Sequence, residues 1–208
     1  MPDLHLLWLR LSSGYTSDRA LQEKRWQELE QLYNSPGRHY HTLQHLRHLF
    51  QLTFEQLASI AQPRAFQFAI FYHDAVYDPT RQDNEVQSAA LARTRLPELG
   101  VPAAEVAHVS QLILATREHL PQSLPDANLL LDFDLAILGA PGEQYQKYSQ
   151  QIREEYRMFP DVAYRQGRRK VLQHFLSREH LYHTPIMRGQ LEQQARQNLK
   201  QEMRLLEG

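Results

Sequence analysis

The His73–Asp74 doublet places an imidazole and a carboxylate inside the apolar run Ile70-Phe71-Tyr72-His73-Asp74-Ala75-Val76. Burying such groups costs free energy unless they are paired or coordinate a metal ion. Imidazole nitrogens and carboxylate oxygens together suit divalent cations of hard to borderline character. The chain contains no cysteine, so a metal site in it must be built from His, Asp or Glu. The doublet therefore indicates a divalent metal site.

Two further polar clusters flank the doublet. His41 and His45 lie four residues apart, and side chains with this spacing share one face of a helix. Such a pair is typical of two metal ligands or of an acid beside a ligand. Asp134 stands between Phe133 and Leu135, where an apolar helix face normally carries an apolar residue. Together these exceptions favour a metal site, although a buried hydrogen-bond network would satisfy the same groups.

The segments that carry these residues are predicted to be helical, because leucine is abundant and alternating strand patterns are hard to find. Asp126 is expected to cap a helix that Gly139 ends, and Thr184 to cap one that begins at Pro185. The other expected helices cover about residues 18–33, 41–57, 63–77, 84–96, 106–117, 143–159 and 161–177. The fold class predicted from this pattern is all-α.

Composition restricts the classes of partner. The net charge is −1, which gives no electrostatic reason to expect a nucleic acid polymer or an anionic membrane as partner. The apolar run Leu6–Leu9 is too short for a signal peptide or a membrane span. A cytoplasmic location is therefore expected. The oligomeric state stays open between a monomer and a homodimer.

The order His … His-Asp … Asp resembles the HD superfamily of metal-dependent phosphohydrolases, and more narrowly a bacterial group of predicted HD phosphohydrolases. The run Tyr40-His41-Thr42-Leu43-Gln44-His45 is similar to the Tyr-His-Asn-x-x-His element of cyclic-nucleotide phosphodiesterases. The resemblance covers about residues 38–140. It implies an HD-type helical bundle and one domain over residues 1–208, in which residues 141–208 pack on the motif core.

The resemblance also assigns roles to residues. It implies that His45, His73, Asp74 and Asp134 hold a divalent ion, which would be Mn, Mg, Fe, Ni or Zn. By the same match His41 is the general acid. Ligating histidines usually need a partner on the other ring nitrogen, and Asp132 is a candidate for it.

Two acidic residues are candidates for orienting or deprotonating the attacking water. Asp78 matches an acidic residue in the His-Asp-x-x-Glu-Asp element of the guanosine-tetraphosphate hydrolases, where Tyr77 takes the place of Glu. Glu85 is the second candidate. Each has a structural alternative, since Asp78 precedes Pro79 in a turn and Glu85 suits the first turn of a helix.

Four basic side chains are candidates for binding phosphate or a second ion. His119 could contact a second metal or a phosphate, and the alternative is a cation at a helix C-terminus. Arg38, Arg153 and Arg168 could each bind a phosphate through two donors. The alternative for a helical arginine is a solvated or ion-paired surface position.

These residues predict a hydrolase that cleaves a phosphoester of a nucleotide or another small phosphorylated metabolite. A metal- or nucleotide-binding module without turnover would use the same ligands. A di-iron oxygenase on a similar scaffold would need further histidine ligands, for which His119 is the nearest spare residue.

Overall fold

The computed structural model describes residues 2–207, and all the regular secondary structure in this range is helical. The predicted all-α class is therefore confirmed. The contacts divide the chain into unit 1, which ends at Leu130, and unit 2, which begins at Leu131. The HD-type bundle and the single domain over residues 1–208 stay predictions.

Unit 1 contains six α-helices, one 3-10 helix and the start of a seventh α-helix. The apolar run near the N-terminus forms α1, whose first turn is capped by Asp3 through the N–H of Leu6. The elements are α1 (Leu4–Ser12), α2 (Arg19–Tyr33), α3 (Leu43–Glu55), η1 (Leu57–Ser59), α4 (Pro63–Tyr72), α5 (Asn84–Glu98), α6 (Ala103–Ala115) and α7 (Pro125–Asp134), which continues into unit 2.

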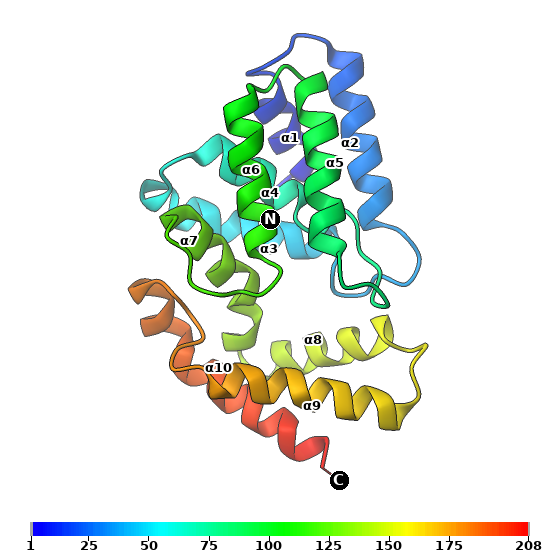
Figure 1. Ribbon diagram of the computed structural model, residues 1–208, viewed down its shortest axis with the longest axis vertical. Helices are drawn as coiled ribbons and strands as arrows, with labels where there is room; N and C mark the ends of the chain where they lie inside the picture. The colour runs from blue at the N-terminus through cyan, green and yellow to red at the C-terminus, as the bar shows by residue number, and fades with distance from the viewer. Residues whose placement is uncertain (1, 208) are drawn as a thin grey trace. The chain divides into compact units, whose positions relative to one another are not determined.

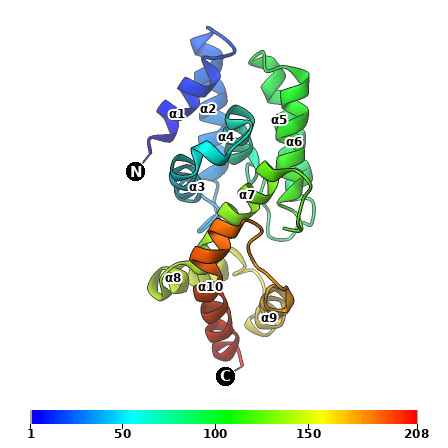
Figure 2. The same ribbon diagram turned by 90° about the vertical axis from the view of Figure 1, so that its left-hand side faces the viewer.

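The helix α4 forms the centre of unit 1. Figure 2 shows α4 between α1–α3 on one side and the neighbouring helices α5 and α6 on the other. Almost every residue of α4 after its first turn is buried. The ring of Trp8 packs at 5.9 Å from that of Phe68 and 5.3 Å from that of Phe71. Because this packing holds α4 on several sides, it also fixes the helix end that carries His73.

The local signals for helix ends act as the sequence predicts. The Asp18 carboxylate accepts a hydrogen bond from the N–H of Leu21 at the start of α2. Gly100 follows α5 with φ +83°, a left-handed conformation that favours glycine. Most predicted helices begin and end within four residues of the observed ones. The exception is α4, which ends at Tyr72 and not at the predicted residue 77, so the doublet follows the helix.

The prediction for Asp126 is wrong. Asp126 lies inside the first turn of α7, is buried, and accepts hydrogen bonds from the backbone N–H groups of Ala61 and Gln62 at 2.9 Å each. It therefore holds the segment before α4 instead of capping its own helix. The predicted helix over 126–138 also divides at Asp134, where η2 (Leu135–Gly139) begins.

Unit 2 contains the end of α7, η2, α8 (Gly142–Glu155), α9 (Asp161–Ser177) and α10 (Pro185–Leu205). The helix α10 packs against η2 and α9 (Figure 1). Gly139 permits this close approach, because a Cβ atom there would lie 2.6 Å from the Cβ of Leu191. Thr184 caps α10 as predicted, through the N–H of Met187.

Over residues 2–207, no helix combines the length and the apolar character needed to cross a bilayer.

Candidate metal centre

His45 and His73 come from the two helices that pack together in the interior of unit 1. His45 lies in the first turn of α3, after the cap Thr42, on the face that buries Leu46 and Leu49. His73 follows the last residue of α4. Their exposed fractions are 3% and 1%, so both imidazoles are removed from solvent.

Hydrogen bonding orients the His73 ring. Its Nδ1 lies 2.9 Å from the carbonyl oxygen of Ile70, and a carbonyl only accepts, so Nδ1 donates. The Nε2 atom then points to the opposite side, 3.2 Å from Nε2 of His45 and 3.1 Å from Oδ2 of Asp74. A backbone carbonyl on one nitrogen is the arrangement that usually fixes a metal-binding histidine.

A shared proton or a bound cation would explain the short distance between His73 and Asp74. If His73 is neutral, its Nε2 carries a lone pair that faces a carboxylate oxygen at 3.1 Å. Two acceptors at this distance repel each other unless a proton or a cation lies between them. His45 Nε2 lies 3.9 Å from the same oxygen. We name His45, His73 and Asp74 the His–Asp cluster.

The fourth predicted ligand, Asp134, is the last residue of α7. One ligand atom from each of His45, His73, Asp74 and Asp134 lies within 4.8 Å of the others. The structure therefore brings together the four residues predicted to bind metal, and this group can hold a metal ion. Two imidazoles and two carboxylates fit a divalent cation of hard to borderline character.

The predicted acid His41 lies next to the His–Asp cluster. Its ring stacks on Tyr77 with centroids 4.3 Å apart, and its centroid lies 6.0 Å from that of His45. The sequence singled out Tyr77 only as a departure from a family pattern. The position of Tyr77 against the His41 ring depends on how the chain continues after the doublet, which residue spacing does not show.

The two candidate water-orienting acids have different surroundings. One carboxylate oxygen of Asp78 accepts hydrogen bonds from the N–H and hydroxyl of Thr80, and these bonds lower the pKa of Asp78 below its usual value. This arrangement favours the turn alternative for Asp78. Glu85 is half-buried in the first turn of α5. Its catalytic role stays a prediction.

The guanidinium of Arg38 is directed at the protein backbone. It donates to the carbonyl oxygens of His41, Asp74 and Ala75 at 3.0, 2.7 and 2.8 Å. The expected phosphate contact is therefore replaced by contacts that hold the chain around the doublet.

Asp132 has a structural role within unit 2 instead of supporting a ligating histidine. Its two carboxylate oxygens accept hydrogen bonds from the backbone N–H groups of His183 and Thr184, at 2.6 and 2.7 Å, and from the Thr184 hydroxyl at 2.6 Å. Burial raises the pKa of Asp132, and these hydrogen bonds oppose the increase. The carboxylate therefore fixes the start of α10.

Arg153 and Arg168 also have partners within unit 2 other than phosphate. Arg153 Nη2 lies 2.5 Å from a carboxylate oxygen of Asp161, and its guanidinium lies over the Tyr164 ring. Arg168 is buried and donates to both carboxylate oxygens of Glu202, at 2.8 and 3.0 Å. Both arginines therefore stabilise the packing of helices in unit 2.

His119 lies in the loop after α6 with φ +50°, an uncommon conformation for a residue other than glycine. It is half-buried, and its role as a metal or phosphate contact stays a prediction.

One supporting residue was not predicted as part of the site. The hydroxyl of Ser88 accepts a hydrogen bond from the N–H of Val76 at 3.0 Å and donates to its carbonyl at 3.2 Å. Ser88 is buried on α5 and holds the chain just after the doublet. The sequence signal that could have identified Ser88 is a small polar residue on an otherwise apolar helix face.

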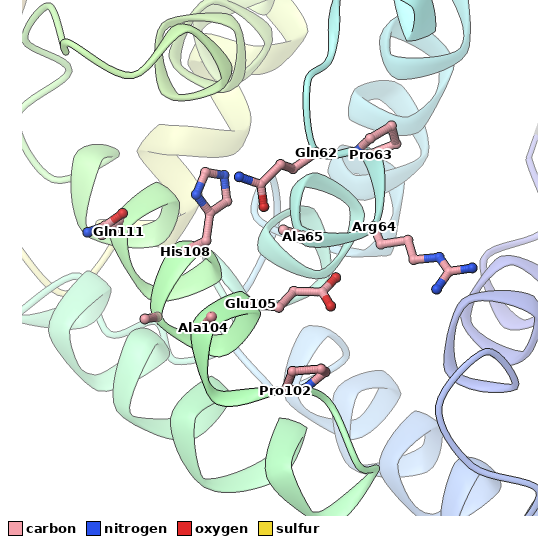
Figure 3. Close-up of a pocket in the computed structure, with 10 residues that line it drawn as sticks. Gln62, Pro63, Arg64, Ala65, Pro102, Ala104, Glu105, His108 and Gln111 are labelled. Atoms are coloured by element: carbon pink, nitrogen blue, oxygen red, sulfur yellow. The ribbon is translucent and has the colours of Figure 1, made fainter.

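A separate cavity of about 750 Å³ lies between α4 and α6 of unit 1. Figure 3 shows the side chains of Gln62 and His108 pointing toward one another across it, while Arg64 extends away. Nε2 of His108 is buried and accepts or donates no hydrogen bond within residues 2–207. The residues that line this cavity include none of those predicted for the active site.

Comparisons of the chain with models of protein families, with curated proteins and with solved structures find no match.

Proposed function

We propose that this protein is a metal-dependent phosphohydrolase that cleaves a phosphoester of a nucleotide or another small phosphorylated metabolite. The observation that supports the proposal most is the convergence of His45, His73, Asp74 and Asp134, whose ligand atoms lie within 4.8 Å of one another. These residues would hold the ion, and the orientation of His73 by the Ile70 carbonyl supports that role.

A divalent ion held by these residues would supply Lewis acidity, which would polarise a phosphoryl oxygen and make water easier to deprotonate. The leaving oxygen needs a proton, and His41, whose ring lies beside that of His45, is our candidate for its donor. Glu85 is our candidate for the acceptor of the water proton.

The proposal is tested by measuring phosphate release from the full chain loaded with Mn²⁺, using a panel of nucleotides and small phosphomonoesters. We expect His73→Ala and Asp74→Ala to lower the rate by about a thousandfold, since the ion contributes several kcal/mol of charge stabilisation. His180→Ala removes an exposed histidine of unit 2 and is the control that should keep full activity.

Each alternative function has its own outcome in this experiment. Metal bound with an affinity that depends on His73, but without phosphate release, would identify a binding module. Metal-dependent consumption of dioxygen would identify an oxygenase. Protein that binds no divalent metal would show that the residues form only a buried hydrogen-bond network, and the proposal would be rejected.

A further inference from the structure

The Arg38 side chain connects the two chain segments that carry the histidines of the His–Asp cluster. Arg38 lies in the segment between α2 and α3, and His45 lies in the first turn of α3. Nη1 donates to the carbonyl of His41 at 3.0 Å and to that of Asp74 at 2.7 Å, while Nη2 donates to the carbonyl of Ala75 at 2.8 Å. One guanidinium therefore holds the entry to α3 against the end of α4.

Two of the carbonyls that Arg38 reaches, those of Asp74 and Ala75, lie just beyond the C-terminal end of α4. The helix dipole favours a cation near this end of a helix. The α-helix α4 ends at Tyr72, and the carbonyls of Asp74 and Ala75 follow it. A guanidinium offers its donors in a fixed planar fork, so it defines the positions of both carbonyls together.

The remaining contacts of Arg38 restrict its movement. Nε donates to the Ser35 hydroxyl at 3.1 Å. The guanidinium carbon lies 5.0 Å from the centroid of the Tyr33 ring and 5.4 Å from that of Tyr77. With four hydrogen bonds to the protein, the guanidinium has about one of its five N–H groups left for any other partner.

We propose that Arg38 is a positioning residue of the metal centre, which sets metal affinity by holding Asp74 and the start of α3 in register. The inference rests on the proposed function only in requiring that the His–Asp cluster binds a divalent ion. It differs from a phosphate-binding role, because the donors of Arg38 are used on backbone carbonyls.

The test is a titration of the metal-free full chain with Co²⁺, followed by the visible absorption of the bound ion. We expect Arg38→Ala to weaken Co²⁺ binding by about 10- to 100-fold, the effect usual for groups that orient metal ligands. Arg38→Lys keeps the charge but loses the fork, so its affinity should lie between those of Arg38→Ala and the unmodified protein. The absorption band should also change in shape for Arg38→Ala.

Arg196 provides a matched control in unit 2. Its Nη2 donates to the carbonyls of Arg178 and Glu179 at 2.8 Å each, just after α9 ends at Ser177. Arg196→Ala therefore removes an arginine that also holds the carbonyls after a helix, but one that holds no predicted metal ligand. It should lower the melting temperature while Co²⁺ affinity stays unchanged.

The outcomes separate this inference from the proposed function. Unchanged Co²⁺ affinity in Arg38→Ala, or an equal loss in Arg196→Ala, would overturn the positioning role. If the unmodified protein binds Co²⁺ but releases no phosphate, the proposed function fails and the affinity comparison still decides the role of Arg38. Absence of Co²⁺ binding in the unmodified protein would overturn both. If Arg38→Ala does not fold, Arg38→Lys decides the question by the same titration.

Discussion

The two units each bury a group of polar side chains, and the two groups differ in how charge is balanced. In unit 2, Glu202 accepts hydrogen bonds from Arg168, Tyr145 and the hydroxyl of Ser149, which we name the Glu202 network. In unit 1, the His–Asp cluster brings a carboxylate oxygen within 3.1 Å of an imidazole nitrogen whose ring already donates on its other side.

The difference shows why burial of polar groups alone does not identify a functional site. The Glu202 carboxylate is neutralised by a guanidinium of the same chain, so its network is complete as folded. In the His–Asp cluster, Nε2 of His73 and Oδ2 of Asp74 face each other at 3.1 Å, an arrangement that a bound cation would stabilise. Arg168, which the sequence suggested as a phosphate ligand, is part of the Glu202 network.

The largest expected effect is the loss of the Glu202 network. Glu202→Ala leaves the buried Arg168 without its carboxylate, which should cost unit 2 about 3–5 kcal/mol of unfolding free energy. Amide hydrogen exchange of α8–α10 measures this loss. Co²⁺ affinity should be unchanged, and a reduction would contradict the division of roles between the two groups.

Bound metal should stabilise the folded state by a smaller amount than the Glu202 network does. At a free Mn²⁺ concentration of a hundred times the dissociation constant, the folded state gains about 2.7 kcal/mol. Both tryptophans, Trp8 and Trp26, lie in unit 1, so their fluorescence follows its unfolding. His45→Ala should abolish the gain. A gain of the same size in that variant would show that the ion binds elsewhere.

A conservative change within the Glu202 network should have a smaller effect. Arg168→Lys retains the charge but replaces two fixed donors with one ammonium, and should lower the stability of unit 2 by about 1.5 kcal/mol. Urea unfolding monitored by circular dichroism measures the change. A stability equal to that of the unmodified protein would indicate that charge alone, without fork geometry, neutralises Glu202.

The smallest effect is a pH dependence in unit 2. Burial opposes ionisation of Glu202, but the hydrogen bonds from Arg168, Tyr145 and Ser149 outweigh it and lower the pKa of Glu202 below its usual value of 4.5. A lowered pKa in the folded state means that the unfolded state binds more protons in this range. The stabilisation is therefore complete above pH 4.5 and is lost as the pH falls through the lower folded pKa.

This dependence is measured as the difference in unfolding free energy between the unmodified protein and Glu202→Gln, followed from pH 7 downward. Taking the difference removes the contribution of Asp132, whose raised pKa acts in the opposite direction. A difference that stays constant below pH 4.5 would show that the Glu202 carboxylate is not the titrating group.

Much of the local structure could be predicted from the sequence, because it depends on neighbours within a few residues. The caps Asp18 and Thr184 and the stop at Gly100 are signals of this kind. The doublet and Asp134 could also be singled out, since charged and imidazole groups in apolar runs need a specific reason for burial. The choice of His45 as the fourth ligand rested on the resemblance in sequence.

The sequence by itself therefore determined the helical class and the residues able to bind a cation. Only the tertiary structure decided the partners of Arg38, Arg168 and Asp132. The reason is physical: a guanidinium bonds equally well to a phosphate, a carboxylate or a backbone carbonyl, and a carboxylate accepts from any N–H. Which of these groups lies within 3 Å of the side chain depends on contacts between segments that are distant in the chain. The spacing of residues within a short segment does not determine those contacts.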